Sequence, residues 1–210
     1  KTAQQINNAI RIEAGNTLKT VSASGSLVFE AEVSEMFPET FSIYELNRFL
    51  SVLSLANMKG ADLIFDNTNF VDIRAGKSSV KYKFTSHDFV THPGKTIVLP
   101  SEDLKVELNS GELQNIQKMA AVLGHKFLEF RVDGGKAYLR TMTPDIGDAS
   151  NDSLVELADV PGTDDGIYKI NFDNLILPDG DYDVTICKAG ISKFQHKSKK
   201  ISVFIGLERI

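Results

Sequence analysis

Short runs of alternating apolar and polar residues, a pattern typical of β-strands, make up most of the chain. They are separated by turn residues such as "AGN", "NTN" and "DGG" and occur in groups of three. The first half contains the runs 8–13, 17–22 and 27–33, then 61–66, 70–76 and 79–86. The second half contains 126–132, 136–142 and 153–160, then 181–188, 191–197 and 200–208. We therefore predict a protein rich in β-sheet.

The stretch "SIYELNRFLSVLSL", residues 42–55, instead has the period of an amphipathic helix. One arc of roughly 120° holds the predicted core residues Ile43, Leu46, Phe49, Leu50 and Leu53. The opposite face carries Asn47, Arg48, Ser51 and Ser54, with Tyr44 and Leu55 among them. A solvated helix face usually carries several long charged side chains of both signs. This face has small polar groups and a single positive charge, which is unusual for a face exposed only to solvent.

A second predicted helix, residues 110–125, repeats this composition, with Ser110 as the candidate N-cap. Its core stripe is Leu113, Ile116, Ala120 and Leu123, with Met119 at the margin. The opposite face holds Gln114, Gln117, Lys118, Ala121 and His125, without an acid. Glu112 lies off that face, in the first turn, where the helix dipole favours a carboxylate. Packing against a neighbouring element would also explain such faces, and two helices do not decide between the alternatives.

The order of elements is one helix followed by three strands, found three times in full. The chain opens at Lys1 without a methionine, and "KTAQQINN" is expected to be the end of an incomplete fourth helix. Residues 171–177, "NFDNLIL", form a short helix at best. We predict an α+β fold of two similar domains, 1–90 and 106–210, joined by a connector at 91–105 within the non-periodic stretch 87–105.

Acidic residues are concentrated in one segment. The formal net charge is −5, but residues 143–166 contain seven Asp or Glu and no Lys or Arg, so the remainder of the chain carries +2. The simplest interpretation is a solvated loop and strand edge, because the acids do not have the spacing of a calcium loop. No run of 18 apolar residues exists, so we expect no membrane span. The single cysteine, Cys187, fits a reducing compartment.

Candidate catalytic or metal-binding residues are few. His87, Asp88 and His92 are possible metal ligands, but two histidines in a loop are more often only loop residues. Cys187 alternates with Ile186 in a predicted strand, which favours a buried structural thiol over a nucleophile. No glycine-rich phosphate loop precedes a helix. We therefore expect no enzyme activity, no cofactor and no metal.

The segment "TFSIYELNRFLSVLSLA" resembles the Tyr-Asp-Leu-Asn-x-Phe-Leu-x-x-Leu-Ser-Leu segment of the DNA polymerase sliding clamps of T-even-type tailed bacteriophages. "LVFEAEVSE", "ELQNIQKMAAVLG", "LPDGDYDV" and "ISVFIGLE" lie in register with the same family. The resemblance implies a ring-shaped homotrimer around duplex DNA, with helices facing the hole and sheets outside. Such a ring tethers the replicative polymerase during phage DNA replication, is placed on DNA by a clamp loader, and acts in the cytoplasm of the infected bacterium.

The resemblance assigns the polar helix faces to the hole. The residues expected to face DNA are Arg48, Lys118, Asn47, Ser51, Gln114 and His125. Weak, water-compatible contacts would hold DNA without preventing sliding, since a dense Lys/Arg array binds phosphates tightly. Two departures from the family are the incomplete first helix and Ala121, which occupies a position that tends to be basic.

Two further surfaces follow from the resemblance. We expect strand 79–86 of one subunit to pair with strand 152–160 of the next, because opposite charges would set the partner and register. The interface residues are Lys81, Tyr82 and Lys83 on one strand and Asp152, Glu156 and Asp159 on the other. A short hydrophobic peptide of the polymerase and other clients would bind a pocket beside the connector. Its expected lining is Ile97, Val98, Leu99 and Pro100, with Val203 and Ile205 as the floor. The alternative function is a non-catalytic, β-rich structural or binding protein of a virion.

Overall fold

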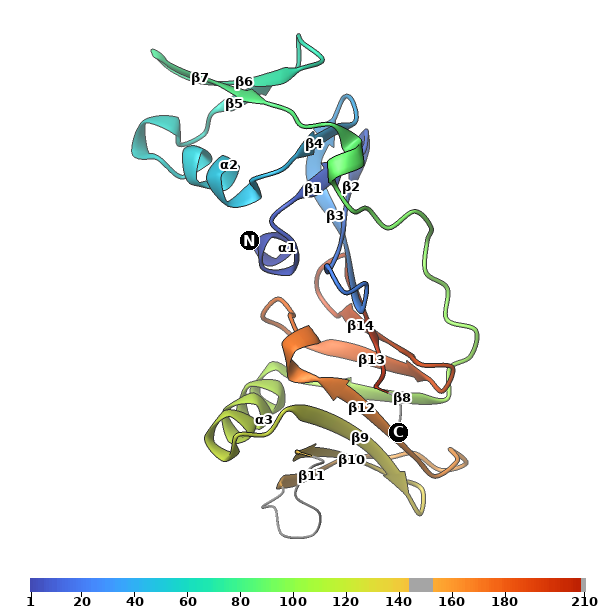
Figure 1. Cartoon of the computed structure of the whole chain (residues 1–210). Coiled ribbons are helices and arrows are strands. Elements are labelled where there is room, and N and C mark those ends of the chain that lie inside the picture. Colours follow the sequence, from blue (N-terminus) through green and yellow to red (C-terminus); the bar gives the residue numbers. More distant parts are fainter. Residues whose placement is uncertain (144–152, 209–210) are drawn as a thin grey trace. The chain divides into compact units, whose positions relative to one another are not determined.

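The computed structural model describes residues 1–143 and 153–208 of the chain (Figure 1). It divides into two compact units, Lys1–Lys95 and Thr96–Ile210, each with its own helix and strands. The division falls within residues 91–105, the segment interpreted above as a connector. No helix among the described residues is long and apolar enough to cross a membrane.

Unit 1 is built from small antiparallel sheets and two helices (Figure 1). β1 pairs with β4, β2 with β3, and β6 with both β5 and β7. Its elements are α1 (Thr2–Ile6), β1 (Ile10–Ile12), β2 (Gly15–Val21), β3 (Leu27–Phe37), β4 (Phe41–Ile43), α2 (Leu46–Leu53), η1 (Ala56–Met58), β5 (Asp62–Ile64), β6 (Phe70–Ala75), β7 (Ser78–Lys83) and η2 (His87–Phe89). The short α1 occupies the position of the predicted incomplete helix.

The core of unit 1 forms where α2 packs against β1, β4 and β6. Phe49 of α2 meets Tyr82 of β7 edge-on, with ring centroids 5.0 Å apart. The predicted helix start was wrong: α2 begins at Leu46, because residues 41–43 pair with β1 as strand β4. Ile43 is completely buried as predicted, but from a strand. Leu46 and Phe49 are buried core residues of α2, whereas Leu50 and Leu53 are only partly buried.

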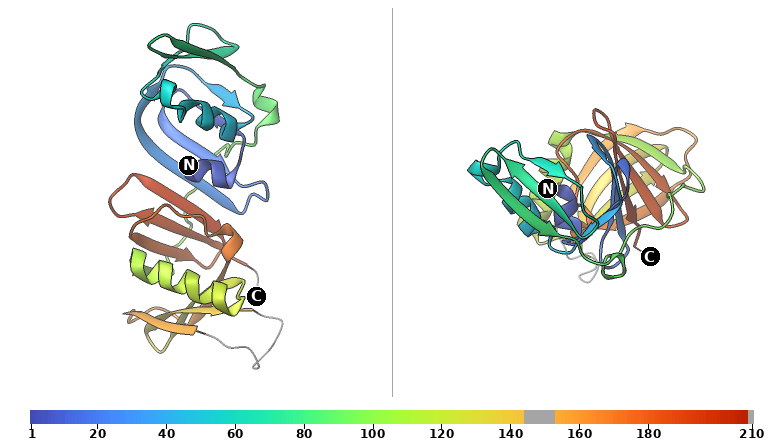
Figure 2. Two further views of the ribbon diagram at one scale, coloured as in Figure 1. Left: turned by 90° about the vertical axis from the view of Figure 1, so that its left-hand side faces the viewer. Right: turned by 90° about the horizontal axis from the view of Figure 1, so that it is seen from above.

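Unit 2 contains two four-stranded antiparallel ladders and one long helix. One ladder has the order β11-β10-β9-β12 and the other β15-β14-β13-β8. The elements are β8 (Leu104–Leu108), α3 (Ser110–Leu123), β9 (Phe127–Asp133), β10 (Lys136–Met142), β11 (Ser153–Asp159), β12 (Gly166–Asn171), η4 (Phe172–Asn174), β13 (Tyr182–Cys187), β14 (Ile191–His196) and β15 (Ile201–Gly206). α3 lies along one side of these strands (Figure 2).

Aromatic side chains from both ladders meet in the core of unit 2. Phe194 of β14 lies edge-on to Phe130 of β9, at 6.3 Å, and to Tyr182 of β13, at 6.2 Å. All three side chains are completely buried. The helix α3 buries Leu113, Ile116 and Ala120, three of the four stripe residues predicted for it. Burial of a large apolar side chain such as Leu113, Ile116 or Phe194 stabilises the folded state by about 1.5–3 kcal/mol relative to leaving that side chain exposed.

Two strands of unit 2 were not predicted. β8 spans the last two residues of the predicted connector and the first three of the predicted second domain. β12 begins at the last residue of the acidic segment, in a stretch for which the sequence predicted no element. Both pair with strands that were predicted, β8 with β13 and β12 with β9. The N-cap of α3 is Asn109 rather than Ser110, because the Asn109 side chain accepts the hydrogen bond from the backbone N–H of Glu112.

Candidate nucleic-acid interface

The polar face of α2 is exposed, and its single cation is paired. Asn47, Arg48 and Ser51 are all exposed, and the Arg48 side chain retains 70% of its accessible surface. Arg48 Nη1 lies 2.8 Å from Oε2 of Glu45, the residue that precedes the helix. The Ser51 hydroxyl donates to the carbonyl of Asn47 at 2.7 Å. The face is therefore polar, but a carboxylate that the sequence interpretation had left out offsets its charge.

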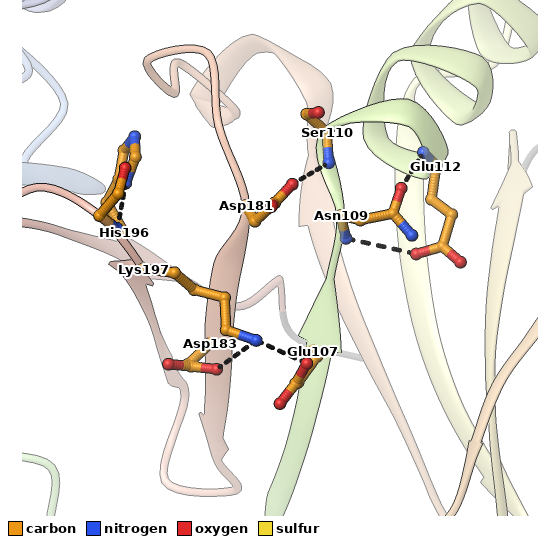
Figure 3. A network of polar contacts seen from close by, with 9 residues as sticks. Glu107, Asn109, Ser110, Glu112, Asp181, Asp183, His196 and Lys197 are labelled. Atoms are coloured by element: carbon orange, nitrogen blue, oxygen red, sulfur yellow. Dashed lines mark hydrogen bonds and ion pairs between the residues drawn. The ribbon is translucent and has the colours of Figure 1, made fainter.

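Local hydrogen bonds fix the first turn of α3 (Figure 3). Asn109 accepts from Glu112 N at 2.8 Å, and Glu112 Oε2 accepts from Asn109 N at 3.3 Å, which makes a reciprocal capping box. Asp181, at the β13 end of the neighbouring loop, accepts from Ser110 N at 2.8 Å. Three of the otherwise unpaired N–H groups at the helix start, those of Asn109, Ser110 and Glu112, are thus satisfied by side chains. Lys197 forms ion pairs with Glu107 and Asp183 at the same end of the unit.

The polar face of α3 carries an uncompensated cation. Gln114 and Lys118 are exposed, and within the described residues Lys118 forms no ion pair. Glu112 is engaged in the capping box, off this face. Ala121 and Val122 continue the exposed surface, with Val122 retaining 83% of its accessible surface. The face thus offers amide groups and one free ammonium group.

His125 differs from the other residues expected to face DNA. It is partly buried just beyond Gly124, which ends α3 in the left-handed conformation. Its Nδ1 lies 2.8 Å from Thr141 Oγ1 on β10. At least this ring nitrogen is therefore committed to the sheet. The sequence predicts His125 on the open face of the helix, but the structure places it at the end of the helix, where its ring contacts β10.

The two strands expected to form the subunit contact both lie at sheet edges. β7 is the last strand of β5-β6-β7, and β11 is the first of β11-β10-β9-β12. Lys81 and Lys83 are exposed, and Lys81 Nζ lies 4.4 Å from the centroid of the Phe70 ring. Tyr82 points the other way, since its hydroxyl donates to the Glu45 carbonyl at 3.0 Å. Only the backbone of Tyr82 lies along the edge.

The acidic partners on β11 are in different situations. Glu156 forms an ion pair with Lys136 of β10 at 2.7 Å, and this hydrogen bond raises the pKa of the Lys136 ammonium. Asp159 is exposed. Asp152 lies outside the described residues. Leu154 and Val155 are also exposed on this strand, so the edge presents apolar as well as acidic side chains.

The expected floor of the peptide pocket is contradicted. Val203 and Ile205 are completely buried, with β14 residues Phe194 and Ser192 as their cross-strand neighbours. They face the core between the two ladders of unit 2, so no peptide can reach them without unpacking that core. Val98 retains 79% of its accessible surface, Pro100 is exposed, and Ile97 and Leu99 are partly buried. The connector wall is therefore accessible, but its proposed floor is not.

An open hollow of about 630 Å³ lies elsewhere in unit 2, beside the β13–β14 turn. It is lined by Ile167, Tyr168, Lys188, Ala189, Gly190, Leu207 and Glu208. Ile167 is 40% exposed. Burial, followed by the charge of Asp103, raises the pKa of the Tyr168 hydroxyl. The sequence interpretation missed this hollow, although the "KAG" turn and the chain segment after β15 were visible in the pattern.

The end of the connector is anchored beside this hollow. Asp103 N donates to the Ile186 carbonyl at 2.8 Å, and the Asp103 carboxylate accepts from Lys188 N at 2.9 Å. Ser101 Oγ also donates to that carboxylate and lies 3.1 Å from Cys187 Sγ. The Ser101 hydrogen bond, followed by those from Lys188, lowers the pKa of Asp103. The buried Cys187 is therefore part of a structural anchor.

The residues considered as metal ligands have separate partners. His87 Nδ1 lies 2.7 Å from Ser42 Oγ, and His92 Nε2 lies 3.5 Å from Glu13 Oε1. Across residues 1–143 and 153–208, no group of three or more His, Cys, Asp or Glu is arranged to hold a metal ion.

The fold is shared with solved sliding clamps. Proliferating cellular nuclear antigen from Entamoeba histolytica superposes with a TM-score of 0.70 at 11% identity, covering 99% of this chain and 92% of that one. The homologous antigen from Thermococcus kodakaraensis gives a TM-score of 0.70 at 15% identity, covering 99% and 93%. A. fulgidus PCNA, solved with a C-terminal region of FEN-1, gives 0.69 at 13% identity, covering 100% and 93%. The chain therefore has the DNA-clamp fold.

Sequence relatives indicate which kind of sliding clamp the chain is similar to. The "Sliding clamp" of Vibrio phage KVP40 is 29% identical over 213 residues, covering 98% of this chain and 93% of the relative. The "Sliding clamp" of Escherichia phage RB69 is 24% identical, covering 99% and 92%, and that of Enterobacteria phage T4 is 24% identical, covering 90% and 85%. No protein-family model matches the chain. The chain is a homologue of the sliding clamps of T4-like phages, and its function is that of a DNA sliding clamp.

Proposed function

We propose that three copies of this chain form a ring around duplex DNA and that the ring tethers the replicative polymerase of a phage in its bacterial host. The observation that carries the proposal is the matched pair of exposed, carboxylate-poor faces on α2 and α3, in a chain with the clamp fold. Arg48 and Lys118 supply long-range attraction, and Asn47, Ser51 and Gln114 supply neutral contacts. The virion alternative gains no support from the relatives, which are named sliding clamps.

The physical requirement is retention without tight binding. Each phosphate neutralised by a Lys or Arg releases counterions and adds to a salt-dependent affinity. The Arg48–Glu45 ion pair reduces that contribution in unit 1, whereas Lys118 in unit 2 forms no ion pair within the described residues. Retention then comes from the closed ring, and the weak helix faces let the ring slide.

Head-to-tail pairing of β7 with β11 of the next copy would close the ring. Support comes from the position of both strands at sheet edges and from Lys81, Lys83 and Asp159, which are all exposed. An unpaired edge offers backbone N–H and C=O groups to another strand, and opposite charges select the partner.

Client proteins, including the polymerase, would dock through a short apolar peptide near the anchored end of the connector. The exposed Val98 and the hollow lined by Ile167, Tyr168 and Leu207 replace the buried pair Val203 and Ile205 as the expected contacts. A clamp loader would open and reclose the ring on DNA. These partners follow from the clamp function, and Val98→Asp and Leu207→Asp test the peptide surface by titration with the polymerase's C-terminal peptide.

The proposed function is tested by mass and by processivity. Sedimentation of the wild-type protein should give three times the subunit mass of 23.1 kDa. With loader and polymerase of the same phage, the protein should lengthen the products of single binding events on primed circular DNA. The double variant Arg48→Glu, Lys118→Glu should lose this stimulation while remaining trimeric. A monomeric wild-type protein, or an unchanged double variant, would overturn the ring or the inner-face assignment, respectively.

A further inference from the structure

Thr141 of β10 connects the end of α3 to the beginning of β11. Its side chain is completely buried, and Oγ1 lies 2.8 Å from His125 Nδ1. The same oxygen lies 2.8 Å from Ser153 Oγ, on the first residue of β11. Three polar side chains, from a helix end, a central strand and an edge strand, therefore form one hydrogen-bonded chain.

The His125 end of this chain is held rigidly. Gly124 has φ +70°, in the left-handed region that favours glycine, and ends the helix there. The next N–H, that of His125, donates to the Ala120 carbonyl at 2.8 Å. The conformation of Gly124 and this hydrogen bond fix the backbone of His125 and so the position from which its side chain extends. The ring is thus a fixed partner for Thr141, unlike a mobile surface side chain.

At the other end of the hydrogen-bonded chain, the contact between Thr141 and Ser153 bears on the register of the edge strand β11. Thr141 and Ser153 are directly opposite each other in the ladder, and the register shifts further along, between Ala137 and Tyr138. A strand with one free edge is held on one side only, and a slip of one residue turns every side chain to the opposite face. Leu154 and Glu156 lie between Ser153 and that irregularity, so their direction depends on the start of the strand.

We propose that Thr141 is a positioning residue that sets the register of β11 and thereby the side chains this edge presents to the next subunit. The inference rests on the proposed subunit contact for its consequence, but the register itself is a property of the single chain. A hydroxyl at position 141 can donate to one neighbour and accept from the other, so it satisfies both. A valine of similar shape removes both hydrogen bonds and leaves His125 Nδ1 without its partner.

The test compares Thr141→Val with Thr141→Ser, which keeps the hydroxyl. Hydrogen exchange of the segment Ser153–Asp159 should be about fivefold faster in Thr141→Val. This factor corresponds to loss of the single hydrogen bond that Thr141 makes to this strand, at ordinary net strength. Thr141→Ser should stay close to wild type. Exchange in β9 serves as the internal reference, because a general loss of stability would accelerate both strands equally.

The chain supplies a matched control. Thr20 is also a buried strand threonine, but its Oγ1 has no hydrogen-bond partner among the described residues. Thr20→Val should leave exchange in β11 unchanged. If Thr141→Val does not fold, Ser153→Ala removes the outer bond alone and should accelerate exchange in the same segment. Exchange in β11 that is unaffected by Thr141→Val, or by Ser153→Ala in its place, overturns the proposal.

The consequence for the ring is measured separately, by the rate at which labelled and unlabelled subunits mix. Thr141→Val should mix faster than wild type, and Thr141→Ser should restore the wild-type rate. A wild-type protein that is not trimeric would refute the proposed function, while the exchange experiment on the single chain would still decide the role of Thr141. Faster exchange in β11 with unchanged mixing would refute the consequence for the subunit contact.

Discussion

Glu45 and Arg48 form an ion pair at the start of α2, with Oε2 and Nη1 2.8 Å apart. The two residues are three positions apart, so they are neighbours on the helix surface. The Arg48 side chain retains 70% and the Glu45 side chain 45% of its accessible surface, so solvent screens the pair and it contributes little to stability at physiological salt. Its effect is on the potential of the helix face, because the carboxylate offsets the only cation that α2 presents.

Glu45→Gln should therefore strengthen the weak attraction of the protein to linear duplex DNA. The slope of log affinity against log salt should become steeper, by at most about 0.9 if Arg48 gains one phosphate contact. Fluorescence anisotropy between low and moderate salt measures the slope. Asp66→Asn changes the net charge equally at an exposed site outside α2 and should have a smaller effect. Equal slopes for the two variants would show that Arg48 does not face DNA.

Lys81→Glu with Lys83→Glu should weaken the trimer, because like charges would then face Asp159 and Glu156 of the next subunit. The shift towards monomer should be larger at low salt, where charges are screened least. Sedimentation velocity at several protein concentrations measures it. Lys59→Glu with Lys95→Glu, at exposed positions away from β7, is the control for net charge. An unchanged sedimentation profile would remove β7 from the interface.

His92 should make the stability of unit 1 depend on pH. Burial, the largest cause, lowers its pKa below the ordinary value of 6.5, although the charge of Glu13 raises it. The unfolded chain then binds the proton more readily than the folded chain, so stability rises with pH in that window. The contribution is complete above about pH 6.5 and is lost as pH falls towards the lowered folded pKa. Denaturant titrations at several pH values give the free energy of unfolding as a function of pH. This free energy should rise less steeply with pH in His92→Gln than in the wild type, and the same dependence on pH in both proteins would contradict the assignment.

Asn109→Ala should destabilise the protein by about 1 kcal/mol, because it removes the N-cap hydrogen bond to Glu112 N. The loss should appear as a lower denaturant midpoint with an unchanged slope. Asn115→Ala, at an exposed interior position of the same helix, is the matched control. Alanine has the higher helix propensity, so that variant should be neutral or slightly more stable. A result in which the two variants behave alike would show that the cap contributes nothing.

Part of the fold and site was readable from the sequence. The stripe Leu113, Ile116 and Ala120 identified the buried face of α3, and the "DGG" turn identified the hairpin of β9 and β10. β8 carried an alternating pattern as clear as these, with Leu104, Val106 and Leu108 buried. The sequence prediction misses it because the strand lies across the boundary drawn between the connector and the second domain. The Glu45–Arg48 pair was also visible as an i, i+3 spacing.

Other features depended on distant partners. Ile43 fits the helical stripe of α2, but pairing with Ile10 of β1 makes it part of a strand. His125 fits the open face of α3, but the hydroxyl of Thr141 on β10 holds its ring. Local periodicity cannot show such contacts, since they form between residues that are far apart in the chain.

The period of the chain determined that this protein is an α+β chain with repeated groups of strands and two helices that have one apolar and one polar face. It did not determine which face of a strand is inside. Alternation in β15 separates Val203 and Ile205 from Ser202 and Phe204, but the large apolar side chain of Phe204 makes the second face a candidate for the core as well. Packing between the two ladders decided the outcome: Val203 lies beside Phe194 of the neighbouring strand β14, Phe194 meets Phe130 of the other ladder, and Val203 and Ile205 are completely buried. The tertiary structure alone therefore moved the expected peptide surface away from this strand.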